Sequence, residues 1–384
     1  MKIVMDFRKF DGVVGGVEQT VIQITKHLVQ KGHRVIMLPK ESRLNEVKDL
    51  FEKDENLQFI SLQVPNHIMS FKNVYLDNIT IQKIAKKEGA DVIHFPYNWS
   101  FPFLKKVPCI LTIHDVIPFT FREAQSVYFN YFKYKPGIRM ACKLNDVIVT
   151  ISEFSKSDIS KKVGVAEEKI KVIPNGMRNA YKASEELRKE LMSKFQLRDG
   201  FILNVGGIHE RKNIISLIKA FSKLVGDENF QGKLLITGSV AGAPYQLKMK
   251  SLCDIALEET GIKDQIIFTG YVSDEELDTL MREAICLIYP SLYEGFGIPV
   301  LEAMQLGTPV ITSSLTAMPE VVGEAAILVD PNNIESMAKA MSNLINNNAL
   351  RKELTQKGFE RIKLYSWEKT AQQYIELYQD LSSN

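Results

Sequence analysis

The chain has 384 residues, 45% of them hydrophobic, which is enough for two packed domains of roughly 150–200 residues each. Its 48 basic and 46 acidic residues nearly cancel to a formal charge of +2, which argues against a nucleic-acid partner. No apolar run approaches the ~20 residues of a membrane-spanning helix, and the first residues read as a strand and not as a secretory signal. We therefore expect a cytoplasmic protein, with peripheral contact to the cytoplasmic membrane face as an open option.

The amino-terminal half alternates short apolar runs with helical patterns, as a parallel sheet covered on both faces requires. A glycine-containing loop, Asp11–Val17, follows the first strand and leads into an amphipathic helix, Gly15–Gln30. The loop lacks the G-x-G-x-x-G spacing of dinucleotide folds, so a nicotinamide cofactor is disfavoured. Either its glycines let the backbone approach a ligand closely, or the loop is a plain turn between strand and helix. The expected strands are Lys2–Phe7, Arg34–Leu38, Leu57–Leu62, Asp91–Phe95, Cys109–Ile113 and Asp146–Ile151.

Two further stretches of this half are candidates for function. His114 follows a strand at its carboxyl end, where such sheets place functional groups, although a lone histidine is often structural. Tyr128–Lys135 mixes aromatic residues with lysines. A part-buried helix explains that stretch, and contact with lipid head groups or an acceptor is the alternative.

A turn signal, Pro174-Asn175-Gly176, and a polar stretch to about Arg198 indicate the connection between domains. A second alternation follows, so we predict two doubly wound domains with a shared ligand at the carboxyl ends of their strands. We place the domains at residues 1–178 and 179–366; the last helix, about 367–384, could pack on either and is a candidate to return to the first. The strands expected in the second are Phe201–Val205, Lys233–Thr237, Gln265–Phe268, Ile285–Tyr289, Pro309–Thr312 and Ala326–Val329.

Two loops of the second domain predict a ligand site. The loop Gly206–Asn213 carries Arg211 and Lys212 at a helix start, which the helix dipole disfavours unless an anion comes between. A diphosphate would supply that anion, and a solvated basic turn is the alternative. The stretch Tyr289–Glu302 joins a buried strand to a helix through a glycine-rich turn between Glu294 and Glu302, with Pro299 suited to the first helical position. An anionic, hydroxyl-rich ligand fits such a turn.

Metal chemistry has little support in the sequence. The cysteines are far apart in apolar segments and read as buried reduced thiols: Cys109, Cys142, Cys253 and Cys286. The sequence has no H-E-x-x-H, C-x-x-C or D-x-D pattern. We therefore expect no metal, and fixed cations with helix ends would neutralise a leaving phosphate.

The segment Glu294–Glu302 resembles the E-x7-E signature of retaining family 4 glycosyltransferases, which have the GT-B fold. The resemblance implies a nucleotide-sugar donor, GDP- or UDP-linked, bound mainly by the second domain. It also implies a glycan or lipid-linked acceptor bound mainly by the first, and no metal or other cofactor. The likeness covers nearly the whole chain, through Gly15-Gly16, Thr112–Asp115, Ile151–Lys156, Pro174–Gly176, Arg211–Asn213 and Gly307–Val310.

The resemblance also implies roles for single residues. Glu302 would bind ribose hydroxyls, Glu294 the 3- and 4-hydroxyls of the donor sugar, and Lys212 with Arg211 the diphosphate. Backbone N–H groups would complete the phosphate cradle, and His114 would contact the sugar near the reacting carbon. The remaining positions expected to line the donor site are Gly15, Gly16, Gly207, Gly295, Phe296, Gly297 and Ile298.

One position departs from the family pattern. Many relatives have an arginine where this chain has Gly207, and Arg211 is a candidate to replace it from the other side of the loop. A subgroup with G-x-x-x-x-R-K-N in this loop contains mannosyltransferases, which hints at GDP-mannose.

The predicted reaction is transfer of a mannose- or glucose-type hexose with retention at the anomeric carbon, in polysaccharide or glycoconjugate synthesis. An acceptor hydroxyl attacks from the front face, and its proton passes to a leaving phosphate oxygen. Two alternatives stay open. One is a nucleotide-sugar epimerase of the same two-domain shape, and the other is an inactive partner subunit that binds glycan.

Overall fold

The computed structural model describes residues 1–64, 71–121, 130–198, 200–238 and 244–383. The chain divides into two compact units. Unit 1 comprises Met1–Phe119, Val127–Gly176 and Tyr365–Asn384, and unit 2 comprises Thr120–Ser126 and Met177–Leu364. The division after Gly176 lies close to the boundary expected after residue 178, and the last helix groups with unit 1. Tyr128–Phe129, in the aromatic and basic stretch, lies outside the described residues.

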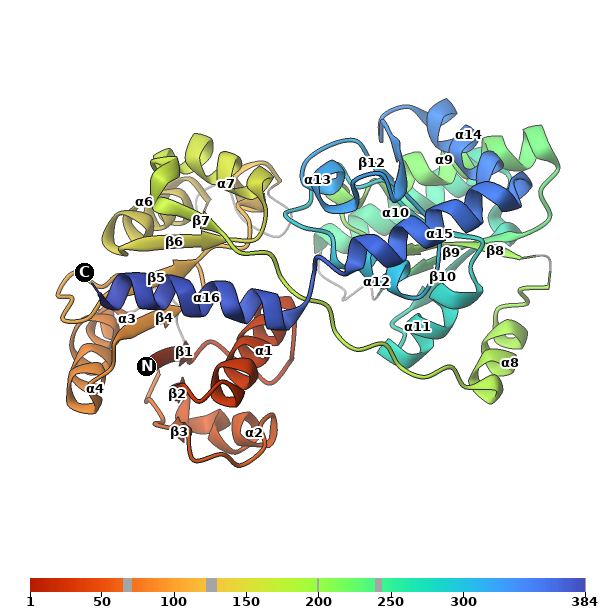
Figure 1. Ribbon diagram of the computed structural model, residues 1–384. Coiled ribbons are helices and arrows are strands. Elements are labelled where there is room, and N and C mark those ends of the chain that lie inside the picture. Colours follow the sequence, from red (N-terminus) through yellow and green to blue (C-terminus); the bar gives the residue numbers. More distant parts are fainter. Residues whose placement is uncertain (65–70, 122–129, 199, 239–243, 384) are drawn as a thin grey trace. The chain divides into compact units, whose positions relative to one another are not determined.

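Unit 1 contains a seven-stranded parallel sheet with the strand order β3-β2-β1-β4-β5-β6-β7 (Figure 1). Six of these strands were predicted, with β3 shorter than expected, and the short edge strand β7 was missed. The strands are β1 (Lys2–Phe7), β2 (Arg34–Pro39), β3 (Leu57–Phe59), β4 (Val92–Phe95), β5 (Cys109–Thr112), β6 (Val147–Thr150) and β7 (Ile170–Val172). The helices are α1 (Gly16–Gln30), α2 (Leu44–Asp49), α3 (Phe71–Tyr75), α4 (Ile81–Glu88), α6 (Lys135–Leu144), α7 (Glu153–Ile159) and α16 (Trp367–Ser382).

Helices cover both faces of the sheet of unit 1. Side chains alternate between the two faces along each strand, so neighbouring residues pack against different helical layers. In β1, Ile3 and Met5 pack with α1 and α16, whereas Val4 packs on the opposite face with α4 and α6. The mostly apolar composition of these strands is therefore a consequence of two helical layers.

Helix α16 docks on unit 1 through polar contacts as well as apolar ones. The Tyr378 hydroxyl lies 2.8 Å from Nδ1 of the buried His94, and His94 Nε2 lies 2.7 Å from Thr112 Oγ1. Thr370 Oγ1 donates to the Pro174 carbonyl at 2.7 Å. The last helix of the chain thus returns to the first sheet.

Unit 2 contains a six-stranded parallel sheet with the order β10-β9-β8-β11-β12-β13. All six strands match the predicted runs within two residues at each end. They are β8 (Phe201–Val205), β9 (Lys233–Thr237), β10 (Ile266–Gly270), β11 (Cys286–Tyr289), β12 (Val310–Ser313) and β13 (Ala326–Val329). The helices are α8 (Glu185–Lys194), α9 (Ile214–Glu228), α10 (Pro244–Thr260), α11 (Asp274–Glu283), α12 (Ile298–Gln305), α13 (Met318–Val322), α14 (Ile334–Asn346) and α15 (Asn348–Ile362).

Both sheets have the doubly wound order in which the direction of winding reverses beside the first strand. The reversal lies between β1 and β4 in unit 1 and between β8 and β11 in unit 2. Loops that leave the carboxyl ends of these strands diverge, and ligands bind there.

Two further expectations concern the whole chain. The four cysteines are buried and free, as predicted. In the part of the chain that the structure describes, no helix is long and apolar enough to cross a membrane.

Candidate functional site

The predicted ligand loops of unit 2 meet at the carboxyl ends of β8 and β11, on either side of the winding reversal. After β8 the chain turns through Gly206 and Gly207, whose φ angles of 116° and 74° suit glycine, and makes a short 3-10 turn, Glu210–Lys212. Asn213 then takes the N-cap position before α9, and its Nδ2 donates to the Pro331 carbonyl at 2.6 Å. The loop therefore has a fixed path that presents Arg211 and Lys212 toward β11.

Three donors converge on one oxygen of Glu294. Lys212 Nζ lies 2.7 Å from Glu294 Oε1, Arg211 NH1 lies 2.8 Å from it, and the Tyr289 hydroxyl donates to it at 3.0 Å. Lys212 Nζ also donates to the Tyr289 hydroxyl. The sequence predicted an anion, a diphosphate, beside the two cations at this helix start; in this structure the carboxylate of Glu294 contacts both cations.

This cluster is buried: Lys212 is 5% exposed, Glu294 8% and Tyr289 1%. Burial alone raises the pKa of Glu294, but the Lys212 ammonium and the Arg211 guanidinium together lower the pKa below its usual value. Burial and the neighbouring Glu294 raise the pKa of Tyr289 well above its usual value, so its hydroxyl stays a donor. Among the described contacts of this cluster, two cations face one carboxylate.

The glycine-rich turn ends in a left-handed residue that starts helix α12. Gly297 has φ 95°, and a Cβ there would lie 2.4 Å from Met318 Cε, so only glycine fits. Helix α12 begins at Ile298, which puts Pro299 at the second helical residue and corrects the predicted first position. Proline is accepted there because the first-turn N–H groups have no helical acceptor. These groups and the helix dipole favour an anion at this end.

Glu302 lies on α12 and is held by a residue that was not predicted. Arg178 Nε donates to Glu302 Oε1 at 2.7 Å, and Arg178 NH1 lies 3.1 Å from Oδ2 of the buried Asp278. Burial raises the pKa of Glu302, and Arg178 offsets part of that shift. Arg178 thus joins two carboxylates from separate helices.

The loops of this site carry the motifs through which the sequence resembled a known family, and two family models match the chain in succession. Residues 14–179 match Glycosyltransferase Family 4, and residues 187–361 match Glycosyl transferases group 1. The chain belongs to the family 4 glycosyltransferases. The two matches divide where the structure does, between unit 1 and unit 2.

Relatives with curated names include mannosyltransferases. The chain is 29% identical over 300 residues to O-antigen chain mannosyltransferase B of Escherichia coli, covering 77% of this chain and 76% of the relative. It is 26% identical over 405 residues to the serotype-specific mannosyltransferase WbdA of Escherichia coli, covering 98% of this chain. The chain spans about half of WbdA, 48% of its length.

Solved structures show the same fold over the whole chain. A glycosyltransferase from Rickettsia africae matches with a TM-score of 0.77 at 18% identity, covering 100% of this chain and 99% of that one. Anabaena HepE in complex with UDP and glucose matches with a TM-score of 0.74 at 18% identity, covering 99% and 100%. This glycosyltransferase therefore has the GT-B fold, with two Rossmann-like units.

Unit 2 brings together most of the positions predicted to bind a donor. Arg211, Lys212 and Glu294 are in direct contact, Gly207 begins the same loop, and Gly295–Ile298 connects Glu294 to α12. Glu302 is one turn further along α12 and belongs to the Arg178 and Asp278 cluster instead. Sequence patterns gave no role to Tyr289, although its place at a strand end was a signal. No sequence pattern indicated a role for Arg178, because it is a single cation in the polar stretch that connects the two domains.

The predicted positions of unit 1 lie in a separate part of the chain. One ring nitrogen of His114 donates to the Pro96 carbonyl, and Nε2 is buried without a partner among the described residues. Burial lowers the pKa of His114 to about 4, so the ring is neutral at physiological pH. Gly15 and Gly16 form the start of α1, where a Cβ on Gly16 would meet nothing within 4 Å.

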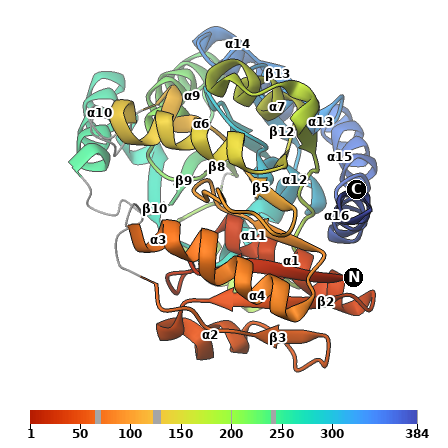
Figure 2. The ribbon, with the colours of Figure 1, turned by 90° about the vertical axis from the view of Figure 1, so that its left-hand side faces the viewer.

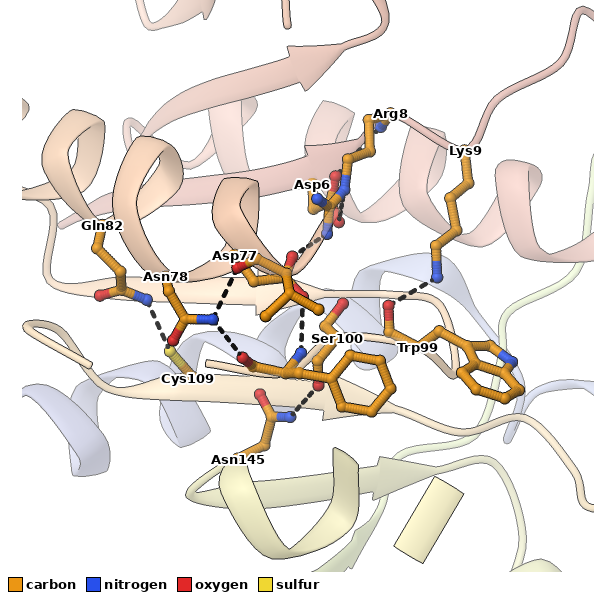
Figure 3. Close-up of polar contacts among 12 residues, drawn as sticks. Asp6, Arg8, Lys9, Asp77, Asn78, Gln82, Trp99, Ser100, Cys109 and Asn145 are labelled. Atoms are coloured by element: carbon orange, nitrogen blue, oxygen red, sulfur yellow. Dashed lines mark hydrogen bonds and ion pairs between the residues drawn. The ribbon is translucent and has the colours of Figure 1, made fainter. Parts of the chain in front are cut away.

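Unit 1 also contains a buried charged cluster, which was not predicted. Arg8 follows β1 and binds Asp6, at 3.1 Å from Nε to Oδ2, and also Asp77, all three being buried (Figure 3). Lys9 Nζ donates to the Trp99 carbonyl at 2.9 Å. Lys9 thus fixes the loop after β1 to the chain that follows β4, and Arg8 fixes it to the helical turn before α4.

Within the described residues no group of histidine, cysteine or carboxylate side chains could hold a metal ion.

Proposed function

We propose that this glycosyltransferase moves mannose, with retention at the anomeric carbon and without a metal, from a nucleotide-diphosphate sugar to a glycan hydroxyl. The contact of Arg211 and Lys212 with Glu294 carries the proposal. Two cations thus lie against the carboxylate that precedes the start of α12, and both the cations and the helix start favour a diphosphate. The named mannosyltransferases among the relatives support mannose as the sugar.

The donor would be held through its hydroxyls and its phosphates. Glu294 uses Oε1 for the protein donors, and its other oxygen can accept from sugar hydroxyls. Glu302 accepts from Arg178 through Oε1, which leaves the second oxygen for ribose hydroxyls. Arg211 would bind the diphosphate beside Lys212 and would replace the arginine absent at Gly207; its contact with Glu294 beside Lys212 supports this role.

His114 would offer a hydrogen-bond acceptor to a hydroxyl of the donor sugar. If Nδ1 carries the proton donated to Pro96, the lone pair of Nε2 accepts from a hydroxyl. A neutral ring suits this role, since it brings no charge near the anomeric carbon.

In the proposed reaction the acceptor oxygen forms a bond to the anomeric carbon while the bond from that carbon to the phosphate oxygen breaks. The acceptor proton passes to a leaving phosphate oxygen on the same face. Arg211 and Lys212 stabilise the negative charge that develops on the diphosphate. Neither Glu294 nor Glu302 acts as a nucleophile, because both are committed to hydroxyl groups.

The donor base is proposed from the loop pattern G-x-x-x-x-R-K-N, which favours GDP-mannose, whereas HepE was solved with UDP. The acceptor is proposed from the names of the relatives, as a glycan of the O-antigen type, free or lipid-linked. Incubation of the full chain with GDP-mannose, UDP-glucose or UDP-galactose and an oligomannose acceptor tests both. Anomer assignment of the product by NMR and retention of activity in EDTA test the stereochemistry and the independence from metals.

Lys212→Ala is the decisive variant. Loss of charge-assisted hydrogen bonds, each worth roughly 1.5–3 kcal/mol, should lower kcat about ten- to hundredfold. The matched control is Lys219→Ala on α9, whose amine makes only an exposed ion pair with Glu259 at 3.9 Å. Wild-type turnover by Lys212→Ala would refute the phosphate role. Turnover without any acceptor would favour the epimerase, and failure to bind any nucleotide would favour the inactive subunit.

A further inference from the structure

One loop of unit 2 touches the proposed donor site although none of the predicted motifs includes it. The loop comprises residues 314–317, which follow β12 and lead into the short helix α13. Strand β12 is the parallel neighbour of β11, and Thr312 Oγ1 near its end donates to the Tyr289 carbonyl at 2.9 Å. The loop after β12 therefore starts beside the loop that carries Glu294.

Thr316 in this loop has a backbone conformation that its side chain disfavours. Its φ is 60°, in the left-handed region, where a β-branched residue is a rare outlier. The other non-glycine residues with positive φ in the described parts of the chain are Gln196, Asn213 and Asn229, and none of them is β-branched. A strained conformation of this kind persists only where surrounding contacts impose it, and it is found most often at functional sites.

The contacts of Thr316 and of the next residue are with Glu294. Thr316 Oγ1 accepts from the backbone N of Glu294 at 3.2 Å, and Ala317 N donates to the Glu294 carbonyl at 3.4 Å. The loop after β12 thus satisfies both backbone groups of this buried glutamate. A glycine at position 316 would suit the φ angle better, but it would leave the Glu294 N–H without this acceptor.

Helix α13 attaches this loop to a packed part of unit 2. It lies beside α12, and α15 packs on α12 (Figure 2). At the end of α13, Arg361 of α15 donates to the carbonyls of Glu320 and Val321, with 2.8 Å between Nε and the Val321 oxygen. At the start of α13, the buried Met318 occupies the space that a side chain on Gly297 would need. The loop therefore has a defined position relative to the glycine-rich turn.

We infer that Thr316 is a positioning residue for Glu294. Lys212, Arg211 and Tyr289 hold the carboxylate of Glu294 at Oε1, and the Thr316 hydroxyl holds its backbone, so the glutamate is fixed at both ends. The strained backbone is the consequence of placing this hydroxyl at the Glu294 N–H.

The inference rests on the proposed function, in which Glu294 binds hydroxyls of the donor sugar. A displaced Glu294 should therefore weaken binding of the sugar and leave binding of the nucleotide unchanged, because the proposal gives the ribose and the diphosphate to other residues. A threonine that only stabilised the loop would have no such selective effect.

Thr316→Gly separates the positioning role from stability. Glycine adopts a positive φ readily, so the variant should melt no lower than the wild type. In calorimetric titration of the full chain it should bind GDP like the wild type, but GDP-mannose about tenfold more weakly. Thr316→Ser keeps the hydroxyl and should recover most of the affinity for GDP-mannose, whereas Thr316→Val lacks the hydroxyl and should not.

The matched control is Gln196→Gly, which makes the same backbone change at φ 54° on an exposed residue just after α8. It should bind both ligands like the wild type. Wild-type affinity of Thr316→Gly for GDP-mannose would overturn the inference, and so would an equal loss of affinity for GDP.

Glu294→Ala shows which proposal fails. If Glu294→Ala loses affinity for GDP-mannose while Thr316→Gly does not, only the positioning role of Thr316 is wrong. If Glu294→Ala also binds GDP-mannose like the wild type, the proposed role of Glu294 at the donor sugar is wrong as well.

Discussion

Arg178 and Glu302 form an ion pair, with 2.7 Å between Nε and Oε1, and the same guanidinium holds the buried Asp278. Arg178 follows directly on the division between the two units, whereas Glu302 and Asp278 come from α12 and α11. A carboxylate proposed for ribose is therefore positioned by the chain segment that connects the units.

Arg178→Ala should weaken nucleotide binding and make it depend on pH. Without the guanidinium, the buried Glu302 faces Asp278 and Asp274 alone, so its pKa, already raised by burial, rises further. The carboxylate is then lost as pH falls through the raised pKa, and affinity should drop on acidification more steeply than in the wild type. Calorimetric titration with GDP over a series of pH values measures this.

Two variants separate this role from a general loss of stability. Arg178→Lys keeps the charge and should recover part of the affinity and most of the pH profile. Glu302→Ala should bind nucleotide weakly at every pH. Unchanged affinity in Glu302→Ala would remove Glu302 from the ribose site, whereas a loss there with no effect of Arg178→Ala would remove only the positioning role.

Tyr289→Phe should reduce turnover modestly. The change deletes one hydrogen bond to Glu294 Oε1 and one from Lys212, each worth about 1 kcal/mol, so kcat/KM should fall by up to about thirtyfold. Tyr271→Phe is the control, since Tyr271 is 79% exposed. Steady-state kinetics with the preferred donor gives the answer, and equal rates for both variants would show that the hydroxyl has no influence on the site.

Gly206→Ala should damage activity beyond its effect on stability. Gly206 has φ 116°, and a Cβ there would lie 3.0 Å from Lys212 Nζ, so the amine must move. Gly261→Ala is a matched control, because it has φ 69° with nothing within 4 Å of the added Cβ. Both should lose about 1–2 kcal/mol to backbone strain. Only Gly206→Ala should lose about tenfold or more in kcat, and parallel losses would argue against a fixed position for Lys212.

Unfolding in mild acid should depend on His94. Burial lowers the pKa of His94 to about 3, so the folded protein holds it neutral while the unfolded chain takes up a proton near pH 6.5. The unfolded state binds more protons between these values, so stability is present above pH 6.5 and is lost as pH falls toward 3. From pH 7 to pH 5 this histidine should cost about 2 kcal/mol.

Urea denaturation at pH 7 and pH 5 tests this. His94→Phe should be less stable at pH 7, because Tyr378 and Thr112 lose their partner, but it should lose less on acidification. Tyr378→Phe keeps the histidine and should retain the wild-type pH slope. If the free energy of unfolding of His94→Phe falls from pH 7 to pH 5 as much as that of the wild type, groups other than His94 cause the acid sensitivity.

The sequence by itself determined the two doubly wound units, most of their strands and most of the residues of the proposed donor site. Apolar runs at regular spacing indicate buried parallel strands. The charged residues and glycines of the loops after Val205 and Tyr289 lie close together in the sequence, so a local pattern could reveal them. The three-residue strand β7 was not predicted, because so short an edge strand lacks a sustained pattern of apolar residues. The return of α16 to unit 1 stayed open, since an amphipathic helix matches any apolar groove.

Only the tertiary structure decided which charges meet. It joined Lys212 and Arg211 to Glu294 across two loops, Arg178 to Glu302 across 124 residues, and His94 to Tyr378 across 284. Side chains far apart in the chain become partners through the order of strands in a sheet and the packing of helices on it, and no local pattern records that order.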